Sequence, residues 1–229
     1  MFDILLSSYP LFLEATLLTL RLTVISLIIG CGVGLLVAFF RISNSKLLQS
    51  IAHVYITIIR GTPLIVQIAV LYFGISGAIT LSSFWAGAIA LAVHNGAYIS
   101  EIFRGSIQSI DRGQMEAAKS LGMHTSLAMR RIILPQAFKR AIPPLGNQFI
   151  IGLKDSSLVA YVGMQDLWGT GLSEAASNYR QLETYMVVGI YYLALVLIFT
   201  YVVNRLENRL NTGSTRKKKQ GQAEVSQSV

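Results

Sequence analysis

The sequence predicts an all-α, polytopic membrane protein with five transmembrane helices, and three observations lead to this fold class. The 229-residue chain is 53% hydrophobic and only 13% charged, which lies outside the range of soluble proteins. Its mean hydropathy is +0.56. Uncharged stretches about as long as a bilayer core is thick recur along the chain, and no segment alternates polar and apolar residues as a strand would.

The first span is expected at about residues 20–41, after an outer-face N-terminal segment, residues 1–15. The N-terminus has Asp3 and no early Lys or Arg, so it lacks the basic region of a cleavable signal peptide and the span should be retained. Nineteen uncharged residues separate Arg21 from Arg41, about 28 Å at helical rise. Gly30 and Gly34 lie four residues apart and predict close packing against another helix.

Four further spans complete a transmembrane domain that covers residues 16–208. They are expected at about residues 61–80, 84–103, 146–164 and 184–204. Residues 41–60 are polar with an amphipathic middle, and predict a short helix along the membrane surface. The fourth span is only weakly hydrophobic, because Lys154 and Asp155 lie near its middle. Residues 209–229 have the composition of a disordered basic cytoplasmic tail.

The positive charges predict the topology. Of the nineteen Lys and Arg residues, three lie at 41–60, seven at 101–147 and six after residue 203. These three regions share one side only if five spans place the N-terminus outside and the C-terminus in the cytoplasm, as the positive-inside rule requires. The same rule accounts for the net charge of +8 without nucleic acid as a partner.

Residues 105–145 form the one long polar interval, and its basic residues exclude it from hydrocarbon. We expect a short exposed helix here that ends at Gly122 in a left-handed conformation. A second helical run, about residues 126–138, should stop at Pro143-Pro144.

The pattern inside this loop resembles a known one. Glu116-Ala117-Ala118 is followed by Gly122 and then by Ile132, Leu134 and Pro135. This spacing is similar to the coupling motif of ABC importer permeases, the inner-membrane components of binding-protein-dependent transport. Further motifs resemble the polar amino-acid branch of that family: Arg60-Gly61-Thr62-Pro63 with Gln67, His94-Asn95-Gly96-Ala97-Tyr98 with Glu101, and Leu153-Lys154-Asp155-Ser156-Ser157-Leu158, with Ser156 where relatives commonly have Thr.

The resemblance implies a permease subunit in the bacterial cytoplasmic membrane that carries a polar or charged amino acid, as glutamine, arginine, histidine and cystine permeases do. It implies a second permease subunit (a copy or a close paralogue), two ATPase subunits, an extracytoplasmic amino-acid-binding protein and membrane lipid as partners. The implied ATPase-coupling residues are Glu116, Ala117, Ala118, Gly122 and Pro135.

The chain is not expected to be an enzyme or to bind a cofactor. It has no Gly-x-x-x-x-Gly-Lys phosphate loop, so ATP and Mg would bind the partner ATPase. His53, His94 and His124 are widely separated and have no neighbouring ligands at metal-binding spacings.

Polar residues inside the predicted spans are candidates for a substrate pathway. These are Gln67, His94, Asn95, Tyr98, Glu101, Lys154, Ser156 and Ser157. Ionisable groups in a span are costly and should face a protein interior or an aqueous cavity. His94, Tyr98 and Glu101 follow helical spacing and share one face. The alternative is structural: an interhelical network on the third span, partners that hold the fourth span, and helix-end geometry at Gln67.

A second function remains open, namely an ATP-independent secondary amino-acid carrier or channel subunit. The intramembrane Lys154, Asp155 and His94 favour it. The absence of an internal repeat and the small number of spans argue against it. A membrane-anchored sensor would leave Lys154 and Asp155 without a role.

Overall fold

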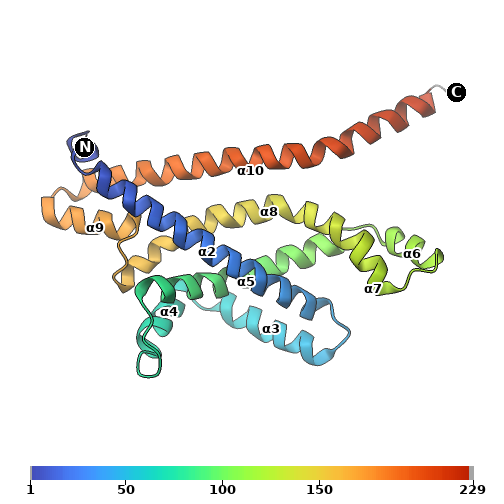
Figure 1. The fold of residues 1–229 in the computed structure, drawn as a ribbon, viewed down its shortest axis with the longest axis horizontal. Coiled ribbons are helices and arrows are strands. Elements are labelled where there is room, and N and C mark those ends of the chain that lie inside the picture. The colour runs from blue at the N-terminus through green and yellow to red at the C-terminus, as the bar shows by residue number, and fades with distance from the viewer. Residues whose placement is uncertain (1, 227–229) are drawn as a thin grey trace.

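The computed structural model describes residues 2–226, with side chains described as far as Arg209, and every regular element in that part is a helix (Figure 1). The α-helices are α1 (Phe2–Ser7), α2 (Tyr9–Ile42), α3 (Lys46–Gly61), α4 (Leu64–Ala69), α5 (Ser83–Gln108), α6 (Arg112–Ser120), α7 (Thr125–Ala128), α8 (Leu134–Asp155), α9 (Leu167–Asn178) and α10 (Gln181–Ser226). Two π-helical turns, η1 (Val70–Gly74) and η2 (Met129–Ile133), and a 3-10 segment, η3 (Ser156–Val162), join them. The predicted all-helical class is confirmed.

Helix α5 runs through the middle of the molecule, with α2 crossing it on one side and α8 on another (Figure 1). The α2–α5 contact is very close. A Cβ added to Gly34 would lie 2.6 Å from Cγ2 of Ile99 and 2.9 Å from the carbonyl oxygen of Gly96. A Cβ on Gly30 would lie 3.1 Å from the carbonyl oxygen of Ala92. The small residues on α2 therefore let the two helices touch backbone to backbone.

Two helices are long and apolar enough to cross a membrane by themselves, α2 and the Gln181–Arg209 part of α10. A third crossing is possible if α3 and the Leu64–Gly74 segment, which meet at an angle of 103°, form one bent span. Helices α5 and α8 have 26 and 22 residues, about 39 and 33 Å at helical rise, but carry more polar groups. The count of five spans and the orientation of the termini therefore remain predictions.

The second predicted span, residues 61–80, is not one continuous helix. Helix α4 and η1 end at Gly74, and residues 75–82 form an irregular loop. Most of the predicted surface segment, residues 41–60, belongs to α3, whose Ala52 and Ile56 are buried with Val37 of α2. An amphipathic pattern predicts a helix with one apolar face, and here a neighbouring helix covers part of that face.

Pro143-Pro144 do not stop a helix, contrary to the prediction, because α8 passes through both residues. Each proline lacks the N–H that would bond the carbonyl four residues earlier, at Lys139 and Arg140. Both of those residues are exposed, so water can solvate the free carbonyls and the helix continues.

The first predicted span, about residues 20–41, is part of a longer helix. Helix α2 already begins at Tyr9 with Pro10 in its first turn, and α1 alone precedes it. Two groups of elements mark the ends of the molecule: α1 and α9 lie at one end, called here the α9 end, and α6 and α7 at the other, the α6 end (Figure 1). Of the predicted disordered tail, residues 209–229, only Arg209 has a described side chain; the backbone of α10 continues to Ser226, and residues 227–229 lie outside the described residues.

Candidate functional site

Helix α6 carries the motif that resembles a coupling motif, and its two ends are fixed by backbone geometry. The Asp111 carboxylate accepts a 2.7 Å hydrogen bond from the backbone N–H of Gly113 at the start of the helix. At the other end, Gly122 has φ +79°, and the N–H of Met123 bonds the carbonyl of Ala118 at 3.1 Å. The predicted left-handed glycine end is confirmed.

The motif residues on α6 face two ways. Ala118 is only 1% exposed, so it belongs to the contact of α6 with α7 and η2. Glu116 and Ala117 are exposed. Leu121, which follows the helix, is 82% exposed and was not among the predicted residues. The signal in the sequence was a leucine directly before the glycine that ends a polar helix. Pro135 lies outside α6, in the first turn of α8.

The segment that leads into α6 contacts both α5 and α8. The Arg140 guanidinium on α8 donates a 3.0 Å hydrogen bond to the Ser109 hydroxyl at the end of α5, and a second one to the Ser109 carbonyl. Below α6, Ile110 is buried together with Ile133 and Ala137. These contacts connect α6 to both α5 and α8.

Gln67 holds the bend between α3 and α4. Its amide Nε2 lies 2.9 Å from the carbonyl oxygen of Ile59 and 2.9 Å from the hydroxyl of Thr62, both at the end of α3. Its Oε1 lies 3.3 Å from Nδ1 of His94 on α5. The side chain therefore caps a broken helix and ties the bend to the central helix. This is the helix-end geometry that the sequence left as one alternative.

The bend also brings charged groups to one face of α5. The rings of His94 and Tyr98 lie 5.2 Å apart, and the guanidinium of Arg60 lies 4.9 Å from the Tyr98 ring centre. Asp155, at the end of α8, interacts electrostatically with His94. An exposed cation of α3 and the imidazole of α5 thus lie on either side of the Tyr98 ring, and Asp155 of α8 lies within electrostatic range of the imidazole. Arg60 and Asp155 join the predicted residues here.

Glu101 lies on the same face, but its carboxylate is already paired. Oε2 accepts hydrogen bonds from Nη2 and Nε of Arg104, at 2.6 and 3.0 Å. Oε1 lies 3.6 Å from Nε of Arg41 at the end of α2. Glu101 therefore joins α2 to α5, which is the structural alternative for this residue.

Asn95 lies on a different side of α5. It is 1% exposed, and its Oδ1 accepts a 2.9 Å hydrogen bond from Nε2 of Gln148 on α8. The hydroxyls of Ser156 and Ser157 donate to the carbonyls of Leu153 and Lys154, each at 2.7 Å. The structure therefore does not bring these three side chains together with His94. The Lys154 side chain is exposed.

A buried carboxylate at the α9 end was not predicted. Asp166 is 0% exposed and accepts a 3.0 Å hydrogen bond from the N–H of Gly169, which caps α9. Its Oδ2 and the hydroxyl of Tyr192 on α10 are both buried and interact electrostatically, but neither has a partner with the geometry of a hydrogen bond. Burial raises the pKa of Asp166 to about 6.

The described residues contain no group of His, Cys, Asp or Glu that could hold a metal ion.

Comparison with known proteins gives a consistent result. Residues 9–212 match the family described as binding-protein-dependent transport system inner membrane component. The glutamine transport system permease protein GlnP of Escherichia coli K12 is 38% identical over 204 residues, 88% of this chain and 93% of that protein. The arginine transport system permease protein ArtQ of Bacillus subtilis is 36% identical over 89% of this chain and 94% of its own length. The L-cystine transport system permease protein TcyL of the same species is 37% identical over 86% of each chain.

Two solved structures share the fold. A chain in a crystal structure of an amino acid ABC transporter with histidines superposes with a TM-score of 0.87 at 38% identity, over 91% of this chain and 98% of that one. A chain of the MetNI methionine ABC transporter in an inward-facing conformation gives 0.76 at 21% identity, over 89% and 97%, a likeness of fold alone. With its family match, its relatives and its fold in agreement, the chain belongs to the binding-protein-dependent transport system inner membrane components, in the group that includes these amino-acid permeases.

Proposed function

We propose that this chain is the permease subunit of an ATP-driven importer for a polar or charged amino acid in the cytoplasmic membrane. It crosses the membrane five times with its N-terminus outside and acts with a second permease subunit, two ATPase subunits and an extracytoplasmic binding protein. The observation that carries the proposal is α6, a short helix with both ends fixed and with Glu116, Ala117 and Leu121 exposed. A solvent-exposed helix of this kind suits a rigid contact with another protein.

Coupling then proceeds through the attachments of α6. The ATPase contacts Glu116, Ala117 and Leu121, and closure of the ATPase dimer displaces α6. Because Arg140 joins the end of α5 to α8 and Ile110 packs with η2 and α8, the displacement reaches both helices together. These helices carry His94 and Asp155, so movement at the α6 end changes the surface on which a solute would rest.

The substrate surface is the group formed by Arg60, His94, Tyr98 and Asp155. An amino acid carries a carboxylate and an ammonium group at neutral pH, and a site with one fixed cation and one fixed anion complements both. Arg60 would bind the carboxylate and Asp155 the ammonium, while the Tyr98 ring orients the Arg60 guanidinium. The glutamine, arginine and cystine permeases among the relatives favour amino acids as cargo, and the second permease subunit would face this surface.

The coupling role is tested by Glu116→Lys in the complete complex. The variant should insert in the membrane as before and lose copurification with the ATPase, since a reversed charge on the exposed face opposes docking. Retention of the ATPase at the level of the parent protein would reject the role of α6.

The cargo is tested by thermal unfolding of the complex with a panel of amino acids. A ligand at a hundred times its Kd should add about 2.7 kcal/mol to the free energy of unfolding. Asp155→Asn should abolish the shift, and Lys154→Gln, the adjacent exposed residue, should retain it. Equal shifts in both variants would remove Asp155 from the site.

The secondary carrier remains the second candidate because His94 and Asp155 interact within the helical part of the chain, as proton-coupled carriers require. Transport by the chain alone in vesicles, without ATP or an ATPase, would decide for it.

A further inference from the structure

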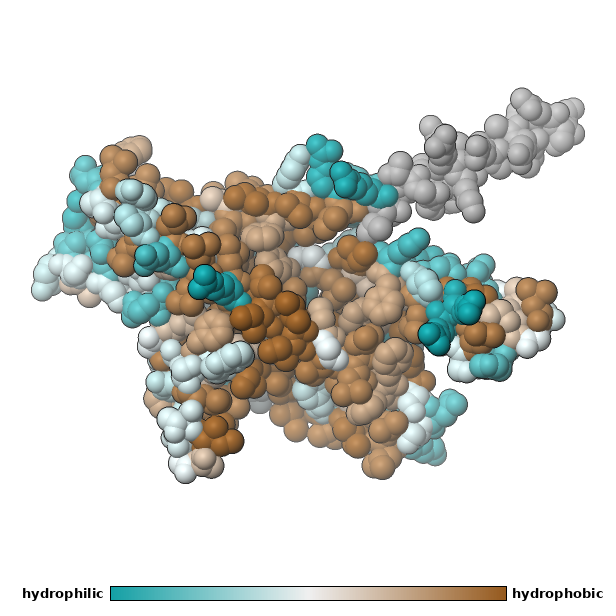
Figure 2. All heavy atoms as spheres, viewed as in Figure 1, coloured by the Kyte–Doolittle hydropathy of each residue, from teal (hydrophilic) through white to brown (hydrophobic). Residues whose placement is uncertain are grey.

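A groove that the proposed transport function does not use lies between α2, α8 and α10, toward the α6 end. It has a volume of about 230 Å³ and is lined by Leu27, Ile142, Leu145, Gly146, Phe149, Val203 and Leu206. All of its lining side chains are apolar, and Leu206 remains 48% exposed. In Figure 2, apolar surface between α8 and α10 gives way to hydrophilic surface toward the α6 end.

The groove is closed at one end and open at the other. The rings of Phe149 and Phe199 lie 4.5 Å apart and close it toward the α9 end. Its floor is shallow because α8 and α10 touch there: a Cβ on Gly146 would lie 2.7 Å from Cγ1 of Val203. Beyond this contact the axes of α10 and α8 diverge toward the α6 end (Figure 1), and the exposure of Leu206 shows that the groove is open on that side.

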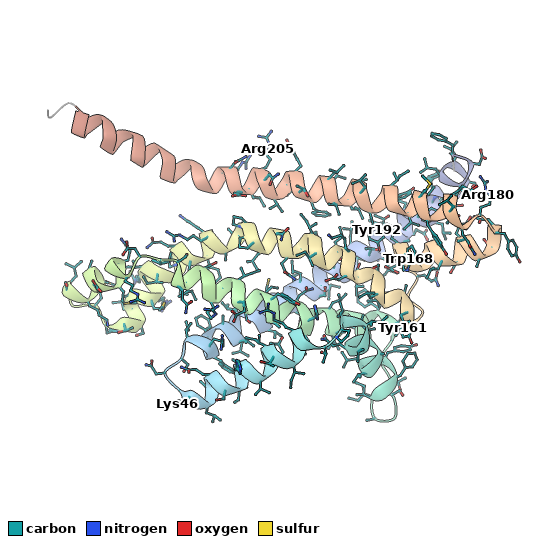
Figure 3. All side chains as sticks on the ribbon, turned by 180° about the vertical axis from the view of Figure 1, so that it is seen from behind. Lys46, Tyr161, Trp168, Arg180, Tyr192 and Arg205 are labelled. Atoms are coloured by element: carbon teal, nitrogen blue, oxygen red, sulfur yellow. The ribbon has the colours of Figure 1, made fainter. Side chains whose placement is uncertain are left out.

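Two basic side chains, Lys139 and Arg209, lie at the open end of the groove. On α8, the residues Lys139, Ile142, Gly146 and Phe149 follow helical spacing and share one face, so Lys139 lies one turn beyond the groove. On α10, Arg209 lies one turn beyond Leu206. Within the described residues, neither cation has an ion pair or a hydrogen bond. By contrast, the guanidinium of the neighbouring Arg205 donates to the Tyr201 hydroxyl at 3.0 Å, and Figure 3 shows it on the side of α10 away from α8.

The length of the groove matches one leaflet. Phe149 lies ten positions after Lys139, about 15 Å along the helix at helical rise. The hydrocarbon core of a bilayer is about 30 Å thick, so an acyl chain from one leaflet extends about half that distance. A chain that starts at the cationic end would therefore finish near the Phe149–Phe199 pair.

We propose that this groove binds an anionic phospholipid, with one acyl chain along Ile142, Phe149 and Leu206 and the headgroup phosphate between Lys139 and Arg209. Apolar burial holds the chain, and the two cations select the charge of the headgroup. A zwitterionic lipid can fill the same groove but adds a positive group beside the two cations, so it binds more weakly. The bound lipid joins α8 to α10 where their own contact ends.

The test uses the full chain in detergent micelles and titrates it with phosphatidylglycerol or phosphatidylcholine, with bound lipid counted by native mass spectrometry. The double variant Lys139→Gln/Arg209→Gln should weaken phosphatidylglycerol binding about thirtyfold, since each cation near an anionic headgroup contributes about a factor of five. Arg205→Gln is the matched control and should change it less than twofold. Unchanged binding in the double variant, or equal affinity of the parent for both lipids, would overturn the proposal.

A second variant tests the groove itself. Leu206→Trp should fill it and abolish retention of both lipids, while Ile198→Trp, at a 57% exposed position of α10 outside the groove, should leave retention unchanged. The lipid-free Tm of both variants should agree within a few degrees, which shows that each is folded. The parent could instead be a dimer that Leu206→Trp separates into monomers while lipid retention is unchanged. That outcome would mean that a second copy of the chain occupies the groove, and it would reject the lipid. Competition by free inorganic phosphate would reject the acyl-chain contribution.

Discussion

At the scale of single residues, Asn95 shows how a polar side chain can serve the scaffold. It is buried where α5 meets α8, and Gln148 is its hydrogen-bond partner. Its neighbour His94 faces the surface with Arg60 and Tyr98. Adjacent residues on one helix thus have separate roles.

Asn95→Ala should lower the free energy of unfolding by about 1–3 kcal/mol. The Gln148 side chain is 7% exposed, so its amide would stay buried without a hydrogen-bond partner. Adding Gln148→Leu should remove that unpaired amide. The two changes should therefore be non-additive by about 1 kcal/mol in a double-mutant cycle, measured by unfolding of the purified complex. Additivity within about 0.3 kcal/mol would show that the two amides do not interact.

Asp166 makes stability depend on pH, and the sign follows from its raised pKa. Its pKa is about 6 in the folded chain and about 3.9 when unfolded, so the folded state holds the proton more tightly. The resulting stability is complete below about pH 4 and is lost as pH rises through about 6. The loss should amount to about 2–3 kcal/mol.

Asp166→Asn should remove this dependence and raise stability at pH 7, because asparagine still caps α9 but cannot ionise. The measurement is the Tm of parent and variant from pH 4 to pH 8. Asp3→Asn, an exposed acidic residue of α1, is the control and should keep the slope of the parent. Parallel curves for parent and Asp166→Asn would show that Asp166 does not titrate in this range.

At the scale of the element, α6 presents a surface that the sequence described only in part. Glycine after a polar helix predicted the left-handed end correctly, since only backbone conformation is involved. The exposure of Leu121 and the burial of Ala118 depend on which side of α6 meets η2. That information belongs to the tertiary packing and is absent from a tripeptide motif.

Leu121→Ala should weaken ATPase binding about thirtyfold while the fold is unchanged. The leucine is 82% exposed in the chain alone, so truncation costs the isolated permease little, but a leucine buried in an interface contributes about 2 kcal/mol. Binding can be measured by titration of the ATPase against the permease in nanodiscs. Leu182→Ala, 72% exposed at the α9 end, is the matched control. A similar loss in the control, or none in Leu121→Ala, would contradict an apolar anchor at this position.

The sequence predicted one effect of proline on a helix correctly and another wrongly. Pro63 lies at a sharp bend, as proline rules predict, while Pro143-Pro144 lie inside a continuous helix. The difference is the surroundings of the freed carbonyls. Gln67 satisfies carbonyls at the bend, and exposure to water satisfies those before Pro143. Both places contain a proline, and the outcome depends on what surrounds the carbonyl that the proline leaves without a backbone partner.

At the scale of the molecule, helical content and family could be predicted because hydropathy and motif spacing are local properties. The face with His94 and Tyr98 followed from helical period alone. The contribution of Asp155 to that face could not be derived, because it depends on how α8 meets α5.

Topology is testable as a whole. In a Cys31→Ser background, Tyr179→Cys should react with a membrane-impermeant maleimide in intact cells stripped of the outer membrane. Asn44→Cys and Ser120→Cys should react only after permeabilisation, since the positive-inside rule places both in the cytoplasm. All three positions are exposed, so access of the reagent is not limited by the fold. Labelling of Asn44→Cys and Tyr179→Cys from the same side would exclude the five-span arrangement.

The glycine contacts of α2 have a consequence for motion during transport. A Cβ on Gly34 would collide with the Ile99 side chain and the Gly96 carbonyl of α5, so these two helices have little room to slide past or rotate against each other. If the chain works as proposed, α2 and α5 should move together as one rigid unit, and the changes of shape during transport should occur at the bend held by Gln67 and along α10. A larger residue at position 34 should therefore impair assembly itself, whereas changes at Gln67 should alter only how fast the cargo moves.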